Sequence, residues 1–95
     1  MRITENQRKA LCKLIHFAFV DIRFLVATGK PEQAGDLADA FHNLPKDMWK
    51  DDFSLEQFSD QFLKVYQDKY PDDRPRDYVK AVAKIIASEE DVSTN

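Results

Sequence analysis

Hydrophobic residues recur at intervals of three and four along almost the whole chain, and no stretch alternates apolar and polar residues as a half-buried strand does. Spacings of three and four place side chains on one face of a helix. The sequence therefore predicts an all-α fold, a compact bundle of four principal helices with a short connector turn before the third. Residues 1–88 form one predicted domain, and residues 89–95 have so few apolar side chains that we expect a frayed tail.

The first predicted helix begins after Thr4 and runs to about Thr28. Thr4 and Gln7 have the spacing of a capping box, in which each side chain accepts from the other residue's backbone amide. Gly29 suits the left-handed conformation that ends a helix, and Pro31 suits the first turn of the next one. The broad apolar face of this helix contains Leu11, Leu14, Ile15, Ala18, Ile22, Leu25 and Val26.

A second apolar strip, formed by Phe17, Val20 and Phe24, lies beside that face. A helix that is apolar around so much of its circumference is either the central helix of a domain or one that a second subunit partly covers. We expect the strip to pack under the last helices or, alternatively, to form a homodimer, because three large exposed apolar side chains mark an interaction site.

The second helix is predicted from Pro31 to about Asn43. Pro45 is expected to stop it, because the residue before a proline is pushed out of the helical region. Residues 45–53 are then a charged connector with at most one helical turn.

The third helix has the clearest start in the chain. Ser54 and Gln57 form a second capping-box pattern, and Phe53 and Phe58 have the spacing of a hydrophobic staple. Pro71 ends this helix. Its predicted apolar face contains Leu55, Phe58, Phe62, Leu63, Val65, Tyr66 and Tyr70.

The last helix follows a loop predicted at residues 72–75 and ends near Ser88. Its predicted apolar face contains Tyr78, Val79, Val82, Ile85 and Ile86.

Composition excludes several classes of protein. Two glycines in the whole chain are too few for the loops with which nucleotide-binding folds hold phosphate. The single Cys12 cannot form an intramolecular disulfide, so a cytoplasmic location is favoured. The most apolar stretch, residues 14–25, is interrupted by His16, Asp21 and Arg23, so we expect no membrane span.

The net charge of −3 is unevenly distributed along the chain. Residues 1–30 carry six Lys or Arg against two carboxylates, whereas residues 31–73 carry eleven carboxylates against four lysines. An acidic balance disfavours nucleic acid, whose binding depends on neutralising phosphates with clustered cations. A basic protein is the expected electrostatic complement.

Two polar residues are candidates for a ligand site. Asp21 falls within the apolar sector of the first helix, so we expect it to be at least partly buried and to accept from a donor on another helix. His42 lies near the end of the second helix, three residues after Asp39. A structural contact is one interpretation of Asp21, and a carboxylate lining a pocket is the other. The alternative function is therefore a ligand-binding or enzymatic bundle centred on Asp21 and His42.

Other chemistry is sparse. The Asp39 and His42 pair has the carboxylate-x-x-His spacing of metal-binding bundles, but it occurs only once, so no metal and no cofactor are predicted. Ser59 is placed on a solvated helical face, and Cys12 is expected to pack at the border of the apolar face. Without a catalytic constellation, the chain is not expected to be an enzyme.

The connector offers a candidate interaction surface instead. Trp49 is either an exposed binding anchor or a lid over the end of the bundle. We predict a small acidic protein that acts as a protein–protein interaction or regulatory module and binds a basic partner. The alternative is an acidic surface that only maintains solubility. The expected interaction residues are Trp49, Asp36, Asp39, Asp47, Asp51, Asp52, Glu56 and Asp60.

Overall fold

A computed structural model gives the fold of this chain and describes residues 3–72 and 77–93. It confirms the all-α prediction, and no strand occurs in these two ranges. The helices are α1 (Glu5–Ala27), α2 (Pro31–Met48), α3 (Leu55–Phe58), η1 (Ser59–Leu63), α4 (Lys64–Lys69) and α5 (Tyr78–Ser93), of which η1 is a π-helical turn that joins α3 to α4.

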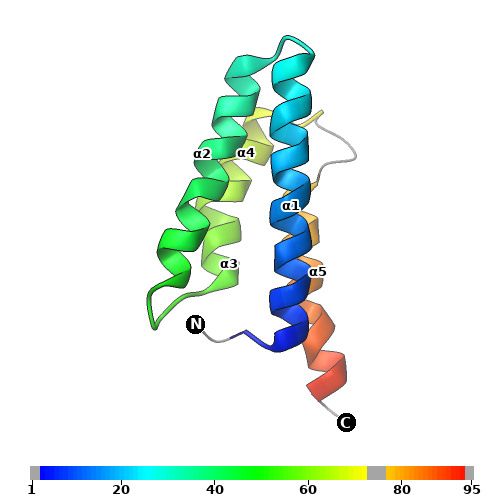
Figure 1. The fold of residues 1–95 in the computed structure, drawn as a ribbon. Coiled ribbons are helices and arrows are strands. Elements are labelled where there is room, and N and C mark those ends of the chain that lie inside the picture. Colours follow the sequence, from blue (N-terminus) through cyan, green and yellow to red (C-terminus); the bar gives the residue numbers. More distant parts are fainter. Residues whose placement is uncertain (1–2, 73–76, 94–95) are drawn as a thin grey trace.

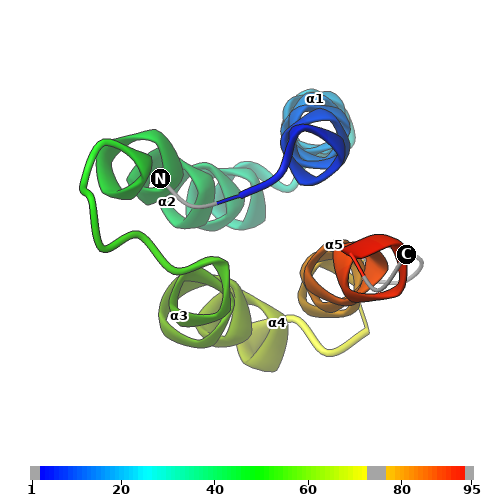
Figure 2. The same ribbon diagram turned by 90° about the horizontal axis from the view of Figure 1, so that it is seen from below.

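The helices form an up-down-up-down bundle (Figure 1). Seen from the end in Figure 2, α1 and α2 form one layer, and the α3–η1–α4 segment and α5 form the other. The α1 helix contacts α2 and α5, and α2 contacts η1 and α4. The core fills the space among α1, α2, the α3–η1–α4 segment and α5. The loop predicted at residues 72–75 lies mostly outside the described residues.

The turn between α1 and α2 confirms the predicted roles of Gly29 and Pro31. Gly29 has φ of +81°, a conformation that glycine adopts without steric cost. The Lys30 amide donates to the Leu25 carbonyl at 2.8 Å and the Gly29 amide donates to the Val26 carbonyl at 3.3 Å, which is the hydrogen-bond pattern of a Schellman motif. Pro31 occupies the first turn of α2.

The start of α1 is tied both to itself and to α5. Thr4 and Gln7 form the predicted capping box, with hydrogen bonds of 3.0 and 3.1 Å. The Gln7 side-chain amide also donates to the carbonyls of Ile85 and Ile86, both at 3.3 Å. One side chain therefore caps α1 and fixes the position of α5 against it.

The predicted end of α2 near Asn43 is wrong, because the helix continues through Pro45 to Met48. An interior proline removes one hydrogen bond and costs about 3 kcal/mol. Leu44 and Phe41 are both buried, and each burial contributes about 1.5–3 kcal/mol. Packing of these two side chains against the core therefore offsets the local cost of Pro45.

The third helical segment is less regular than predicted. The Ser54 hydroxyl accepts from the Gln57 amide at 3.2 Å, which confirms Ser54 as the cap. The π-helical turn at Ser59–Leu63 then widens the helix, because its hydrogen bonds span five residues instead of four. The buried face is rotated after this turn. Ser59 is buried and Val65 is 65% exposed, so both predicted orientations are wrong.

The core is centred on aromatic side chains from three segments. Tyr78 meets Phe41 edge-on with ring centroids 5.3 Å apart, and Tyr66 lies 6.5 Å from Tyr78. The α5 face is confirmed, with Tyr78, Val82 and Ile85 buried. The predicted end near Ser88 is wrong, because α5 continues to Ser93 into the segment expected to fray.

The outer side of α1 also differs from the predictions. Val26 is exposed instead of lying on the buried face, and Cys12 is exposed instead of packed. Phe17, Val20 and Phe24 each keep about half or more of their surface exposed, so the last helices do not cover this strip. The helix thus has one buried face and a largely apolar exposed one.

Candidate interaction surface

Trp49 is the most exposed large hydrophobic residue of the described chain. It is the C-cap of α2, and 91% of its surface is open to solvent, so the lid interpretation is wrong. Two backbone hydrogen bonds shape the connector that follows. The Lys50 amide donates to the Asp47 carbonyl at 3.0 Å, and the Phe53 amide donates to the Lys50 carbonyl at 3.3 Å. These two turns hold Trp49 at the tip of the bundle.

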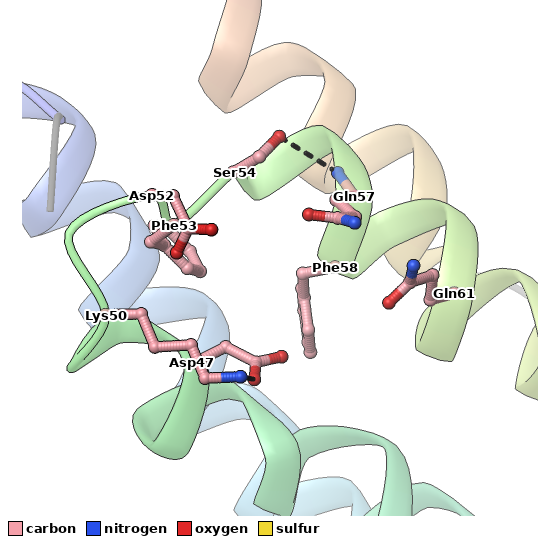
Figure 3. Close-up of a pocket in the computed structure, with 8 residues that line it drawn as sticks. All are labelled: Asp47, Lys50, Asp52, Phe53, Ser54, Gln57, Phe58 and Gln61. Carbon is pink, nitrogen blue, oxygen red and sulfur yellow. Dashed lines mark hydrogen bonds and ion pairs between the residues drawn. The ribbon is translucent and has the colours of Figure 1, made fainter.

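A polar cavity of about 170 Å³ lies directly under the connector (Figure 3). Asp47 and Lys50 form an ion pair across one side of it at 3.6 Å. Asp52 and Gln57 supply further polar groups, and the buried Phe58 ring forms part of the wall. The complete lining is Asp47, Lys50, Asp52, Phe53, Ser54, Gln57, Phe58 and Gln61.

Four of the other predicted acidic residues line two further hollows, whereas Asp51 lines none of the three. Asp36 and Asp39 lie along a groove of about 260 Å³ between α2 and the η1–α4 segment. Glu56 and Asp60 lie along one of about 470 Å³ between the α3–η1 segment and α5. Gln61 lines both the connector cavity and the α2–α4 groove, so those two adjoin.

Asp36 is less available than the sequence indicated. An interaction residue should face outward, but Asp36 is half-buried and accepts hydrogen bonds from the Lys69 ammonium at 2.8 Å and the Tyr70 hydroxyl at 2.5 Å. The hydrogen bond from Lys69, followed by that from Tyr70, lowers the pKa of Asp36. The same contact with Asp36 raises the pKa values of Lys69 and Tyr70. This cluster joins α2 to α4, and the Asp36 carboxylate is already paired with the Lys69 ammonium.

Asp21 is half-buried and accepts a hydrogen bond from the Tyr78 hydroxyl, as expected of a carboxylate with a donor from another helix. Tyr78 itself is buried among core aromatic rings. Asp21 therefore connects α1 to α5 at the edge of the core.

His42 is exposed, and its Nδ1 lies 3.1 Å from the Asp39 carbonyl on its own helix. Neither His42 nor Asp21 lines the three hollows described above. The contacts recorded for these two residues are separate, and they give no support to a ligand site that both would share.

In residues 3–72 and 77–93, no three His, Cys, Asp or Glu side chains are grouped so that they could hold a metal ion. No helix in the same ranges is both long enough and apolar enough to cross a membrane.

Sequence reasoning missed Lys69 and Tyr70 as partners of Asp36, and it missed Phe19, which is 64% exposed. Lys69 and Tyr70 lie 33 and 34 residues from Asp36, a separation at which no local pattern signals contact. The exposure of Phe19 could have been predicted, because a helical period of 3.6 places Phe19 about 100° from the buried Ala18.

Comparison of the chain with family models, curated proteins and solved structures gives no match.

Proposed function

We propose that this protein is a protein–protein interaction module that binds a basic segment of another protein at its connector surface. This surface comprises Asp47, Trp49, Asp51 and Asp52 together with the cavity beneath them. The observation that carries the proposal is the 91% exposure of Trp49.

Exposure of an entire indole ring is unusual when the chain has an apolar core available. Tryptophan is enriched at the energetic centres of protein interfaces, where burial of its large surface stabilises the complex. One of the two backbone turns contains Trp49 and the other follows it, and together they restrict the backbone of Trp49 before binding. Preorganisation of this kind reduces the entropy lost on association.

Charge around Trp49 selects the partner. Lys50 is paired with Asp47, whereas Asp51 and Asp52 are exposed carboxylates at the two central positions of the turn between Lys50 and Phe53. Such groups raise the rate of encounter with a cation and are screened over about 8 Å at physiological ionic strength. The cavity of about 170 Å³ has room for one Lys or Arg side chain beside Asp52. The single cysteine supports a cytoplasmic setting for this interaction.

The test is affinity capture from the source cell, followed by binding kinetics with the purified partner. Trp49→Ala should raise the dissociation rate at least tenfold, as expected for loss of a central anchor. Asp51→Asn combined with Asp52→Asn should slow association and flatten its dependence on salt.

Matched controls lie away from the connector. Val65→Ala removes an apolar side chain that is 65% exposed on α4, and Glu32→Gln removes an exposed carboxylate from the first turn of α2. Both should leave the kinetics unchanged. Unchanged kinetics in the Trp49 and Asp51/Asp52 variants would reject the connector surface as the binding site.

A further inference from the structure

A second exposed surface follows the outer side of α1. Lys13, Phe17, Val20 and Phe24, here called the α1 seam, are spaced four, three and four residues apart. All four are exposed, and Phe17 keeps 59% of its surface open to solvent. Alternating spacings of three and four are those at which one helix packs along another in a coiled coil. The other side of α1 packs in the core, so the seam lies on the face of the helix that is turned to solvent.

A basic row runs beside the seam. Lys9, His16 and Arg23 are seven residues apart, and all three are exposed. In a heptad they occupy the flanking position that determines which partner helix is accepted. Asp21 is the only carboxylate side chain within residues 6–27, and it accepts a hydrogen bond from the Tyr78 hydroxyl. Lys9 also pairs with Glu5, at the long distance of 3.8 Å and on the exposed surface, where such pairs contribute little.

We propose that the α1 seam binds an amphipathic helix of another protein that carries carboxylates at the flanking positions of its heptads. Phe17, Val20 and Phe24 supply the apolar contact, and the basic row pairs with the acidic one. This site is separate from the connector surface, has the opposite charge, and does not depend on the proposed function.

A second copy of this chain fits the seam less well. Antiparallel pairing of two α1 helices through their seams would bring the basic rows together, and like charges at flanking positions disfavour association. Parallel pairing would place the basic row opposite Leu14 and Asp21, but Leu14 is buried in the core and Asp21 accepts a hydrogen bond from Tyr78. An acidic helix of different sequence removes that repulsion and replaces it with attraction.

An anionic membrane surface also fits less well. Phe17 and Phe19 are two residues apart, so they point about 160° apart around the helix, with the basic row on the arc between them. A flat surface would meet the basic row before either ring, whereas membrane-surface helices present one continuous apolar face. A partner helix can lie along one side of the basic row without this conflict.

The test uses two synthetic helical peptides of about three heptads, with leucine at the core positions and either glutamate or lysine at both flanking positions. Binding of each to the full chain is measured by fluorescence anisotropy at low and at physiological salt. The glutamate peptide should bind, and its affinity should fall as salt rises. The lysine peptide should bind at least tenfold more weakly.

Two variants on the same helix locate the site. Phe17→Ala should weaken binding of the glutamate peptide about tenfold, whereas Phe19→Ala should leave it unchanged, although Phe19 is 64% exposed. Arg23→Glu should weaken binding of the glutamate peptide and strengthen binding of the lysine peptide. Circular dichroism checks that each variant keeps its helical content.

Four results would overturn the proposal. Equal binding of the two peptides would mean nonspecific apolar adhesion, and equal loss in both phenylalanine variants would remove the seam as the site. Sedimentation of the free chain as a dimer that Phe17→Ala dissociates would assign the seam to a second copy. Binding to vesicles of anionic phospholipid, without binding of the glutamate peptide, would assign it to a membrane.

Discussion

The connector surface and the α1 seam are built in different ways. The connector surface is a short loop at one end of the bundle, with a single aromatic side chain among carboxylates. The α1 seam is a row along a regular helix of 23 residues, with several apolar side chains beside cations. Both expose apolar surface, but Trp49, Asp51 and Asp52 lie beyond the last residue of α2, whereas every residue of the seam lies within a helix that also packs in the core.

This difference determines how each surface responds to substitution. Connector side chains can change without disturbing packed residues, because the loop is held by backbone hydrogen bonds. On α1, each helical turn contains both core and exposed positions, so moving a substitution by a single residue, as from Val26 to Leu25, replaces an effect on binding with an effect on stability.

The largest expected effect separates the two sides of α1. Leu25 is 1% exposed and Val26 is 58% exposed, although they are adjacent in sequence. Leu25→Ala should lower the free energy of unfolding by about 2–5 kcal/mol, because it leaves a cavity in the core. Val26→Ala should change it by about 0.5 kcal/mol or less. Urea denaturation followed by circular dichroism measures both, and equal effects would contradict the division of α1 into two sides.

An intermediate effect is expected where α1 meets α5. Tyr78→Phe removes the hydroxyl that donates to Asp21 and should lower the free energy of unfolding by about 1.5 kcal/mol, a typical value for a hydrogen bond to a charged group. Asp21→Asn keeps an acceptor oxygen and should cost less. The same denaturation measurement applies, and an unchanged free energy of unfolding in Tyr78→Phe would show that this hydrogen bond does not stabilise the contact between α1 and α5.

A smaller, pH-dependent effect is expected at Asp36. Its pKa is lowered by Lys69, so its stabilisation is complete above the ordinary value of 3.8 and is lost as pH falls through the lowered value. The pKa values of Lys69 and Tyr70 are raised, so their stabilisation is complete below 10.0 and is lost as pH rises through the raised values.

Asp36→Asn should therefore lower the denaturation midpoint near neutral pH and flatten its decline at both extremes. Asp39→Asn, on the exposed side of the same helix, is the control and should leave the profile unchanged. Identical profiles for the two variants would show that the Asp36 cluster does not contribute.

The smallest effect is expected at Trp49, the only tryptophan in the chain. Because its ring is already in water, its fluorescence emission should shift little on unfolding, and iodide should quench it equally in both states. Trp49→Ala should leave the denaturation midpoint unchanged. A blue-shifted emission in the folded state would contradict the exposed anchor.

The parts of the fold that depend on neighbouring residues were predictable from sequence. The capping box at Thr4, the left-handed Gly29 and the cap at Ser54 act over a few residues, and all three are confirmed. The end of α2 was not predictable, because burial of Leu44 in a core assembled from distant segments outweighs the local effect of Pro45.

The candidate site was predictable only in part. Sequence indicated Trp49 and its acidic neighbours, but exposure depends on how the connector turns relative to the bundle. Asp36 was assigned to the surface because its partners, Lys69 and Tyr70, come from a helix far along the chain. A periodicity of 3.6 also cannot reveal a π-helical turn, so the face that contains Val65 was misassigned.

The π-helical turn at Ser59–Leu63 also has a meaning for how this chain compares with any relative. Such a turn accommodates one residue more than the regular helix needs, so a related chain without it would align with a one-residue gap between Ser59 and Leu63. Aligning the two chains without that gap would rotate every later position by about 100°. Tyr66 and Tyr70 would then be matched to the wrong residues.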